Sequence, residues 1–399
     1  MTKFIYKVRD RQGKLLTGTL EAEDKRALVR RLSDYGYFVV YVKKFPTQIS
    51  WIGQKIPLDA VILFSHKLSS MISAGIPILR CLHILWEQTE DKGMQLVISE
   101  IENDLEKGAS LSTALKRFPE VFSPIYINLI EVAERGGVLA EILKKIVVFL
   151  ERQRELQMRM KKALTYPTII LGIAVFVFVL MMFFVVPVFR GVFAKLNVSL
   201  PLFTQGILAV SDFFRTCWWS IPVIAIVMIF WYRRYDRTES GRYRIDVCKL
   251  QIPIIGDLIL TAALARFTYA FSLLVVGGVP LVYSIESAKK SAANKVIEAK
   301  FDYIKEKIIH GGSLSEAMAA TKFFPSFLTE MIAIGEESGT LGDMLKIVGV
   351  HMDEEVDYRI NKFVTMVEPI AIVLIGIIVA AILIALYSPV FTLWGRLEG

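Results

Sequence analysis

Residues 131–143 read EVAERGGVLAEIL, and residues 333–345, near the other end of the chain, read AIGEESGTLGDML. Both stretches place apolar residues three and four positions apart, which predicts a helix, and both carry a glycine of the kind that ends one. The positions shared at identical spacing are Glu134 and Glu336, Gly137 and Gly339, Leu139 and Leu341, and Leu143 and Leu345. The sequence therefore predicts that the same helical turn is present twice.

The similarity continues on both sides of this turn. FSHKLSSMISAGIPILRCLHIL (64–85) matches FTYAFSLLVVGGVPLVYSIESA (267–288), and EKGASLSTAL (106–115) matches IHGGSLSEAM (309–318). Further along, Pro167 aligns with Pro369, and the Pro-Val-Phe triplet at 187–189 aligns with the one at 389–391. We infer a duplicated unit that consists of a helical bundle and the membrane helix that follows it.

Three apolar stretches are candidates for membrane helices. The chain is 54% hydrophobic, which is too apolar for an ordinary soluble protein. The apolar runs within residues 164–189 and 367–394 each exceed the roughly 20 residues that cross a bilayer core. Residues 214–232 form a shorter run that ends in aromatic residues, so we predict a second membrane helix there, with a buried core helix as the alternative.

Basic residues cluster at two of the predicted membrane edges. Residues 152–162 and residues 233–244 each hold five arginines or lysines, whereas residues 190–213 hold two. Because basic residues are retained on the cytoplasmic side, this pattern predicts a multi-pass protein of the inner (cytoplasmic) membrane with a cytoplasmic N-terminus. Residues 190–213 are then a periplasmic loop. The net charge of +8 fits contact with membrane lipid, and we predict no nucleic-acid partner.

The remaining segments complete the predicted fold. Residues 1–45 alternate like short strands around one helix, so we expect a small N-terminal α/β appendage that either caps the first bundle or docks a partner. Residues 58–163 and 250–365 read as two homologous cytoplasmic helical bundles. The fold class is an all-α integral membrane protein with a duplicated bundle, three transmembrane helices and this appendage.

The motifs of common enzyme and metal sites are absent from the sequence. It contains no G-x-x-x-x-G-K-[ST] phosphate loop, no G-x-S-x-G nucleophile turn and no H-E-x-x-H zinc motif. The run HMDEEVDYR (351–359) is acidic, and such a run is typical of a solvated helix face, although whether any acidic cluster binds a divalent cation stays open. We predict that the chain is not an enzyme and has no cofactor and no metal.

A set of residues at corresponding positions in the two copies are candidates for partner contacts or for structural roles. We expect the glutamates to make polar contacts within or between the bundles, the glycines to form turns, and the prolines to lie in the first turn of each membrane helix. Glu368 is either a hydrated carboxylate at the membrane edge or a functional charge. The candidates are Glu134, Arg135, Gly137, Glu336, Glu337, Gly339, Pro167, Glu368 and Pro369.

The sequence resembles the GspF/PilC family of inner-membrane platform proteins of type II secretion systems and type IV pili. The resemblance covers essentially the whole chain, including FIYKVRDRQGKLLTGTLEAED (4–24), FPEVFSPIYINLIEVAERGGVL (118–139) and MVEPIAIVLIGIIVAAILIALYSPVF (366–391). It implies a platform that couples a cytoplasmic hexameric assembly ATPase to the insertion of pilin or pseudopilin subunits into a filament. It also implies contacts with other inner-membrane assembly proteins, and we expect a homo-oligomer.

Two other classes of protein compete with this one. A small polytopic transporter is the alternative, although few polar groups lie in the apolar runs to form a pathway. A membrane enzyme with an unrecognised site is the third. The sequence does not distinguish secretion, pilus and DNA-uptake machines.

Overall fold

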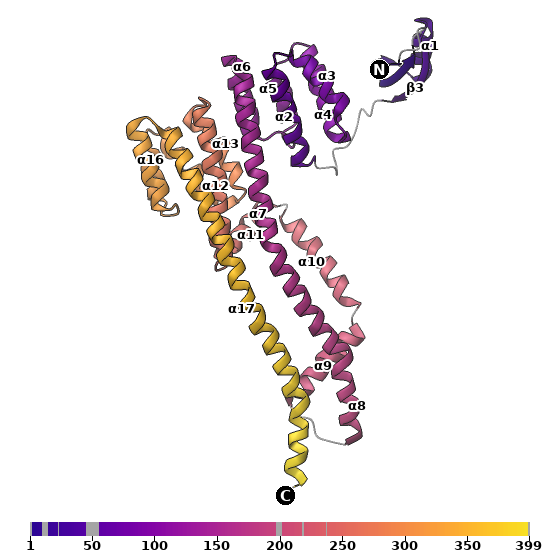
Figure 1. Cartoon of the computed structure of the whole chain (residues 1–399), viewed down its shortest axis with the longest axis vertical. Helices are drawn as coiled ribbons and strands as arrows, with labels where there is room; N and C mark the ends of the chain where they lie inside the picture. Colours follow the sequence, from indigo (N-terminus) through magenta and orange to yellow (C-terminus); the bar gives the residue numbers. More distant parts are fainter. Residues whose placement is uncertain are drawn as a thin grey trace. The chain divides into compact units, whose positions relative to one another are not determined.

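The structure, a computed structural model, describes residues 2–9, 15–22, 24–44, 56–196, 202–217, 219–236 and 238–397. The chain divides into two compact units, Met1–Ile56 and Pro57–Gly399. The described part of the second unit is helical (Figure 1).

The N-terminal unit is a three-stranded antiparallel sheet with one helix packed on it. Its strands lie in the order β2 (Leu15–Ala22), β1 (Thr2–Arg9) and β3 (Phe38–Lys44). Helix α1 (Lys25–Asp34) begins at Asp24, whose side chain accepts a hydrogen bond of 2.6 Å from the Ala27 N–H. The core of the unit consists of Val8, Leu28, Leu32 and Val42.

The first copy of the repeat is a bundle in which short helices lead into one long helix. The helices are α2 (Leu58–Ser73), α3 (Ile78–Gln88), α4 (Lys92–Glu106), α5 (Leu111–Lys116), α6 (Pro124–Gly136) and α7 (Leu139–Leu180). Three helices begin at a side chain that caps a free amide: Asp91, Ser110 and Ser123. In the core, the Tyr126 hydroxyl accepts a hydrogen bond of 3.1 Å from the Ser65 hydroxyl, so its polar end is satisfied.

The second copy repeats this plan helix by helix. Its elements are α12 (Ile255–Val276), α13 (Leu281–Ala288), η2 (Lys289–Ala292), α14 (Lys295–Ile309), α15 (Leu314–Ala320), α16 (Ser326–Ser338) and α17 (Leu341–Leu397). The backbone agrees as well, because Gly75 after α2 and Gly278 after α12 have φ angles of 79° and 80°. Helix α11 (Glu239–Gln251) precedes the second copy. The prediction of a mainly helical, duplicated chain is confirmed.

The helices that leave each bundle continue without a break past the aligned prolines. Helix α7 runs on through the π-helical turn η1 (Met181–Val185) into α8 (Val186–Leu196), and α17 is 57 residues long. At about 1.5 Å per residue α17 extends about 85 Å, far more than the bilayer core of about 30 Å. Helices α7 and α17 lie side by side over part of their length (Figure 1).

This continuity corrects the predicted role of the prolines. We expected Pro167 and Pro369 in the first turn of separate membrane helices, but both lie inside α7 and α17. A proline inside a helix removes one backbone hydrogen bond, and membrane helices tolerate this loss when neighbouring groups compensate. The carbonyl that loses its amide partner is that of Ala163, and α7 nevertheless continues past it to Leu180. The bundle and the span that follows it are therefore one helix.

Three described helical stretches are long and apolar enough to cross a membrane: Leu139–Gly191, Ile255–Val276 and Leu341–Ala385. The first contains the predicted span 164–189, and the third contains much of the span 367–394. The stretch Ile255–Val276 is α12, and 61% of its apolar window is buried inside the protein. Because α12 also corresponds to the bundle helix α2, we assign it to the core of the second bundle.

The predicted middle span, 214–232, is not one straight helix in the structure. Helix α9 (Leu202–Cys217) ends within it and α10 (Ser220–Asp236) begins, and the two helices differ in direction by 74°. The Ser220 hydroxyl donates to the Cys217 carbonyl at 2.6 Å, and Pro222 has no N–H, as suits the first turn of a new helix. The bent pair could still serve as one span, which would make four candidates.

Helix α9 lies in the segment that was predicted as a loop, and it packs against the two long spans. The Ser211 hydroxyl donates to the Met182 carbonyl in η1 at 2.6 Å, and the Thr204 hydroxyl donates to the Ala385 carbonyl in α17 at 2.9 Å. Both hydroxyl groups are buried, and each donates its hydrogen bond to a backbone carbonyl of a long helix. Helix α9 therefore links the membrane ends of both copies.

Candidate functional site

Glu134 holds the first turn of a neighbouring helix. It lies in the last turn of α6, and its carboxylate accepts hydrogen bonds from the Leu111 N–H (2.5 Å), the Ser112 N–H (3.1 Å) and the Ser112 hydroxyl (2.5 Å). The two amides begin α5, where backbone N–H groups have no partner within the helix and carry partial positive charge. A carboxylate is therefore well matched to this position.

Glu336 makes the corresponding backbone contacts in the second copy, with a hydroxyl from the other serine of the Ser-Leu-Ser motif. Its carboxylate accepts hydrogen bonds from the Leu314 N–H (2.7 Å), the Ser315 N–H (2.9 Å) and the Ser313 hydroxyl (2.8 Å) at the start of α15. Burial by itself would raise the pKa of Glu336, but hydrogen bonds from Ser315, Ser313 and Leu314 outweigh it and hold the pKa below its ordinary value of 4.5. Of the two expected kinds of contact, the structure shows those within each bundle.

The lowered pKa of Glu336 predicts a loss of stability in acid. Because the folded pKa lies below the unfolded value, the stabilisation is complete above 4.5 and is lost as the pH falls through the folded pKa. We expect the unfolding temperature of the purified full-length chain to fall less between about pH 5 and pH 3 in Glu336→Gln than in the wild type. An equally steep fall in Glu336→Gln would contradict this assignment.

Gly137 and Gly339 end the helices that carry these glutamates. Their φ angles are 69° and 71°, in the left-handed region that other residues adopt only at a cost. A Cβ atom at either position would meet no other atom within 4 Å. The requirement for glycine is therefore one of backbone conformation and not of space.

Replacing each of two adjacent glycines by alanine should change the stability of the protein in opposite directions. Gly137→Ala should cost about 1 kcal/mol, because alanine is strained at positive φ. Gly136→Ala should be neutral or stabilising by up to about 1 kcal/mol, because Gly136 is the last residue of α6 and a Cβ there meets only the Val138 Cγ2, at 3.4 Å. Thermal unfolding of the two full-length variants measures the difference. The same destabilisation in both would show that the turn does not require Gly137.

The other candidate residues do not join these caps. Arg135 is exposed and its Nη2 lies 2.6 Å from the Glu131 carboxylate on the same helix. Glu337 is exposed and makes no hydrogen bond or ion pair with any described residue. Pro167 is buried in α7, and the exposed side chains of Glu368 and Pro369 lie on α17.

An ion-pair cluster that the sequence patterns did not predict joins the two copies. Arg159 of α7 lies 2.8 Å from the Asp353 carboxylate and 2.7 Å from the Asp357 carboxylate, both on α17, and its side chain is only 26% exposed. The run 351–359 was predicted to be a solvated helix face, and these two aspartates, whose side chains are 35% and 48% exposed, also pair with Arg159. The sequence does contain a signal for this ion-pair cluster, because residues 152–162 of the first copy are basic and residues 351–359 of the second copy are acidic.

A second polar contact between the copies lies between α6 and α13. The Asn128 side-chain amide donates to the Ser287 hydroxyl at 2.5 Å. Nearby, a Cβ atom on Gly277 would lie 2.8 Å from the Leu129 side chain, so the two bundles approach closely here. The copies are thus joined both in the bundles and along the long helices.

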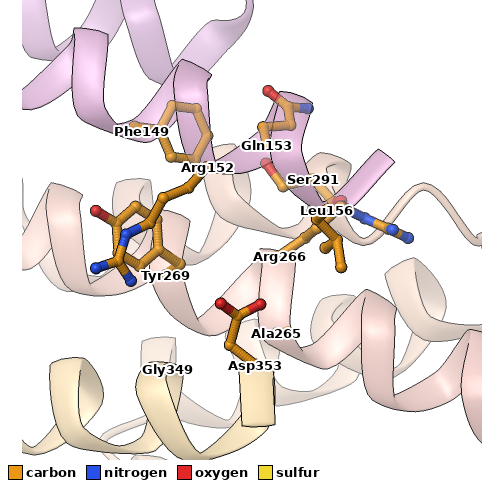
Figure 2. Close-up of a pocket in the computed structure, with 10 residues that line it drawn as sticks. All are labelled: Phe149, Arg152, Gln153, Leu156, Ala265, Arg266, Tyr269, Ser291, Gly349 and Asp353. Carbon is orange, nitrogen blue, oxygen red and sulfur yellow. Dashed lines mark hydrogen bonds between the residues drawn. The ribbon is translucent and has the colours of Figure 1, made fainter. Parts of the chain in front are cut away.

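A small pocket opens between α7, α12, η2 and α17 (Figure 2). The Arg152 guanidinium lies 4.8 Å from the centre of the Tyr269 ring, and the Phe149 ring stacks on Tyr269 with a separation of 6.0 Å between ring centres. Arg266 donates to the carbonyls of Ser291 (3.0 Å) and Ala292 (2.8 Å). The charged and aromatic side chains of the pocket thus have partners within the chain, as expected of a joint between the copies. The lining residues are Phe149, Arg152, Gln153, Leu156, Ala265, Arg266, Tyr269, Ser291, Gly349 and Asp353.

No group of three or more metal-ligating side chains comes together in the part of the chain that the structure describes. The cysteines at 81, 217 and 248 are free thiols.

Comparison with known proteins gives a consistent result over the whole chain. The family model described as Type II secretion system (T2SS), protein F matches twice, over residues 64–187 and 267–389. The model of the N-terminal domain of Type II secretion system protein F matches residues 1–43. The two matches of one model coincide with the two copies in the fold.

Relatives of known name share this full length. The type IV pilus assembly protein PilC of Thermus thermophilus is 36% identical over 100% of both chains. PilC of Myxococcus xanthus is 32% identical over 99% of this chain and 96% of the relative. The type II secretion system protein F of Xanthomonas campestris pv. campestris is 31% identical over 97% of this chain and 98% of the relative. The duplicated bundle and these matches show that the chain belongs to the GspF/PilC family, the type II secretion system protein F family.

Proposed function

We propose that this chain is the inner-membrane platform of a type II secretion or type IV pilus machine. In this proposal it couples a cytoplasmic hexameric ATPase to the insertion of pilin or pseudopilin subunits into a filament. Family membership supports the platform role, since the relatives carry the names of type IV pilus assembly and type II secretion proteins. The candidate membrane spans agree with it.

The continuity of α7 and α17 is the observation that carries the coupling step. Each helix belongs to a bundle at one end and to a candidate span at the other, and Arg159 links the two helices through Asp353 and Asp357. A force applied to a bundle would therefore move the attached span directly, because a packed helix transmits displacement as a rigid element. A flexible linker between bundle and membrane would dissipate it.

The direction of the chain supports cytoplasmic bundles. Both α7 and α17 run from a bundle into a span, and the two bundles contact each other through Asn128 and Ser287, so both bundles lie on the same side of the membrane. The basic residues at 152–162 then lie at the cytoplasmic edge, and the N-terminus of the chain is cytoplasmic.

The proposed partners follow from this arrangement. They are the ATPase below the bundles, the pilin or pseudopilin beside the spans, other inner-membrane assembly proteins, lipid and further copies of this chain. Because the sequence has no phosphate-binding loop, ATP hydrolysis is left to the partner, and the platform itself is non-enzymatic and takes no cofactor.

Interrupting α7 tests the coupling step. Four glycines inserted after Lys162 should separate the bundle from its span and abolish filament assembly or secretion in a strain that depends on this chain. The variant should still enter the membrane and co-purify with the ATPase. The matched control carries the same insertion after Glu90, an exposed residue between α3 and α4, and should retain activity.

Two results would count against this account. Normal filaments from the Lys162 insertion would overturn mechanical coupling through α7. Solute uptake by liposomes that contain this chain alone would favour a transporter instead.

A further inference from the structure

Four arginines around the junction of α10 and α11 are exposed and have no partner among the residues that the structure describes. They are Arg233, Arg234, Arg242 and Arg244. None of these side chains makes a hydrogen bond or ion pair with another described residue. By contrast, Arg154, Arg159 and Arg359 in the same unit are all paired with carboxylates. The four cations lie close together in the sequence, at the ends of two helices that contact each other, and we call this region the α10–α11 basic surface.

The nearby carboxylates do not neutralise this surface. Asp246 of α11 is buried, where it accepts hydrogen bonds from the Lys249 ammonium at 3.1 Å and from the Lys295 N–H at 2.9 Å. Asp236 and Glu239 remain, so two carboxylates lie among the four arginines. The described side chains of this surface thus carry a net positive charge, and it is available to an external anion.

The position of α11 is fixed by the turn before it and by the bundle behind it. At the turn, a Cβ atom on Gly241 would lie 2.2 Å from the Tyr235 carbonyl oxygen, so the backbone can approach this closely only with glycine. The Thr238 hydroxyl caps α11 by accepting the Gly241 N–H at 3.1 Å. On the other side, Asp246 ties α11 to the start of α14. The arginines are therefore presented from a rigid support.

The residues before the arginines have the order expected at the edge of a membrane. Ile226, Val227, Met228, Ile229 and Phe230 of α10 are all more than half exposed, and a helix that is apolar on all sides requires lipid or another protein around it. The exposed aromatic side chains of Trp231 and Tyr232 then follow, directly before Arg233. Apolar, aromatic and basic residues in succession match hydrocarbon, interface and headgroups.

We propose that the α10–α11 basic surface binds the headgroups of anionic phospholipids and holds the second bundle against the membrane. The charge complementarity and the aromatic residues between the apolar and basic segments favour a lipid surface over an acidic protein. This inference does not depend on filament assembly, so the two proposals can fail separately.

Lipid titration of the purified full-length chain in neutral detergent tests the proposal. Short-chain phosphatidylglycerol and phosphatidylcholine are added separately, and bound lipid is counted by native mass spectrometry. The wild type should prefer phosphatidylglycerol by about fivefold or more. Arg242→Gln with Arg244→Gln should remove this preference, and the lysine replacements at both positions should keep it. High salt should weaken it.

Two controls distinguish lipid binding at this surface from a general effect of charge and from binding of free phosphate. Arg80→Gln with Lys107→Gln removes the same charge from exposed positions in the first bundle and should leave the preference unchanged. Inorganic phosphate should not compete, because it lacks the acyl chains that contact the apolar part of α10.

Three results would each overturn the proposal: an unchanged preference in the Arg242 and Arg244 glutamine variant, an equal loss in the control, or full competition by phosphate. Gel filtration checks that every variant is folded. If substitution at these positions removed the lipid preference only by misfolding the chain, the lysine variant would lose the preference too.

Discussion

Glu336→Ala is expected to release the first turn of α15 and to destabilise the second bundle by about 2 kcal/mol. The substitution removes all three hydrogen bonds that the carboxylate accepts, and it leaves the Leu314 and Ser315 N–H groups without their partner. Hydrogen exchange followed by mass spectrometry on the full-length chain measures the effect locally. Peptides that cover α15 should exchange faster, while those of the first bundle should not change.

The neighbouring residue provides a matched control for this experiment. Glu337→Ala removes an equal charge from an exposed side chain without a described partner, and it should change the stability by no more than about 0.5 kcal/mol. Glu134→Ala should reproduce the effect in α5, since its carboxylate makes the equivalent contacts. Unchanged exchange of α15 in Glu336→Ala would mean that the cap contributes nothing to holding this helix.

Reversing the charge of Arg159 is expected to loosen the joint between the two copies. Arg159→Asp would bring a third carboxylate beside Asp353 and Asp357 at a site that is only partly exposed to water. We expect a loss of about 2 to 3 kcal/mol, less than for a fully buried pair. If the joint also transmits force, filament assembly should fall in the same variant. Thermal unfolding and a filament count measure the two effects.

A charge exchange tests whether the pair itself is responsible. Arg159→Asp combined with Asp353→Arg should recover part of the stability, and the double-mutant cycle gives the coupling energy. As a control on the same helix, Arg154→Asp disrupts a pair with Asp59 in which both side chains are more than half exposed, and it should cost no more than about 1 kcal/mol. A coupling energy of zero would contradict the role of Arg159 as a link.

The duplication and the positions of the turns could be predicted because they are local and occur twice. The glycines at 137 and 339 were aligned from sequence, and the structure gives them nearly equal φ angles. The contacts of Glu134 and Glu336 with the starts of α5 and α15 could also be predicted. The Ser-Leu-Ser motif that begins α5 or α15 is followed by a glutamate 24 residues after its first serine in the first copy and 23 residues after it in the second, which is close to what a contact within the bundle would preserve.

The prolines and the middle span show what hydropathy does not report. An apolar run indicates membrane length, but it does not reveal whether a proline begins a helix, as was expected of Pro167, or lies inside one. For α10, Ser220 and Pro222 are helix-start signals within the apolar run, and neither the length of the run nor its aromatic end reports them. The Arg159 cluster depends on how two distant helices pack, which no local pattern determines.

The central claim, a platform between a motor and a filament, is tested most directly by cross-linking in native membranes. The chain is purified after cross-linking, and its neighbours are identified by mass spectrometry. We predict a Walker-motif ATPase linked to residues before about 150, in the N-terminal unit or first bundle, and a single-span pilin-like protein linked to α7 or α17. Recovery of neither, in cells that are assembling filaments, would contradict the coupling account.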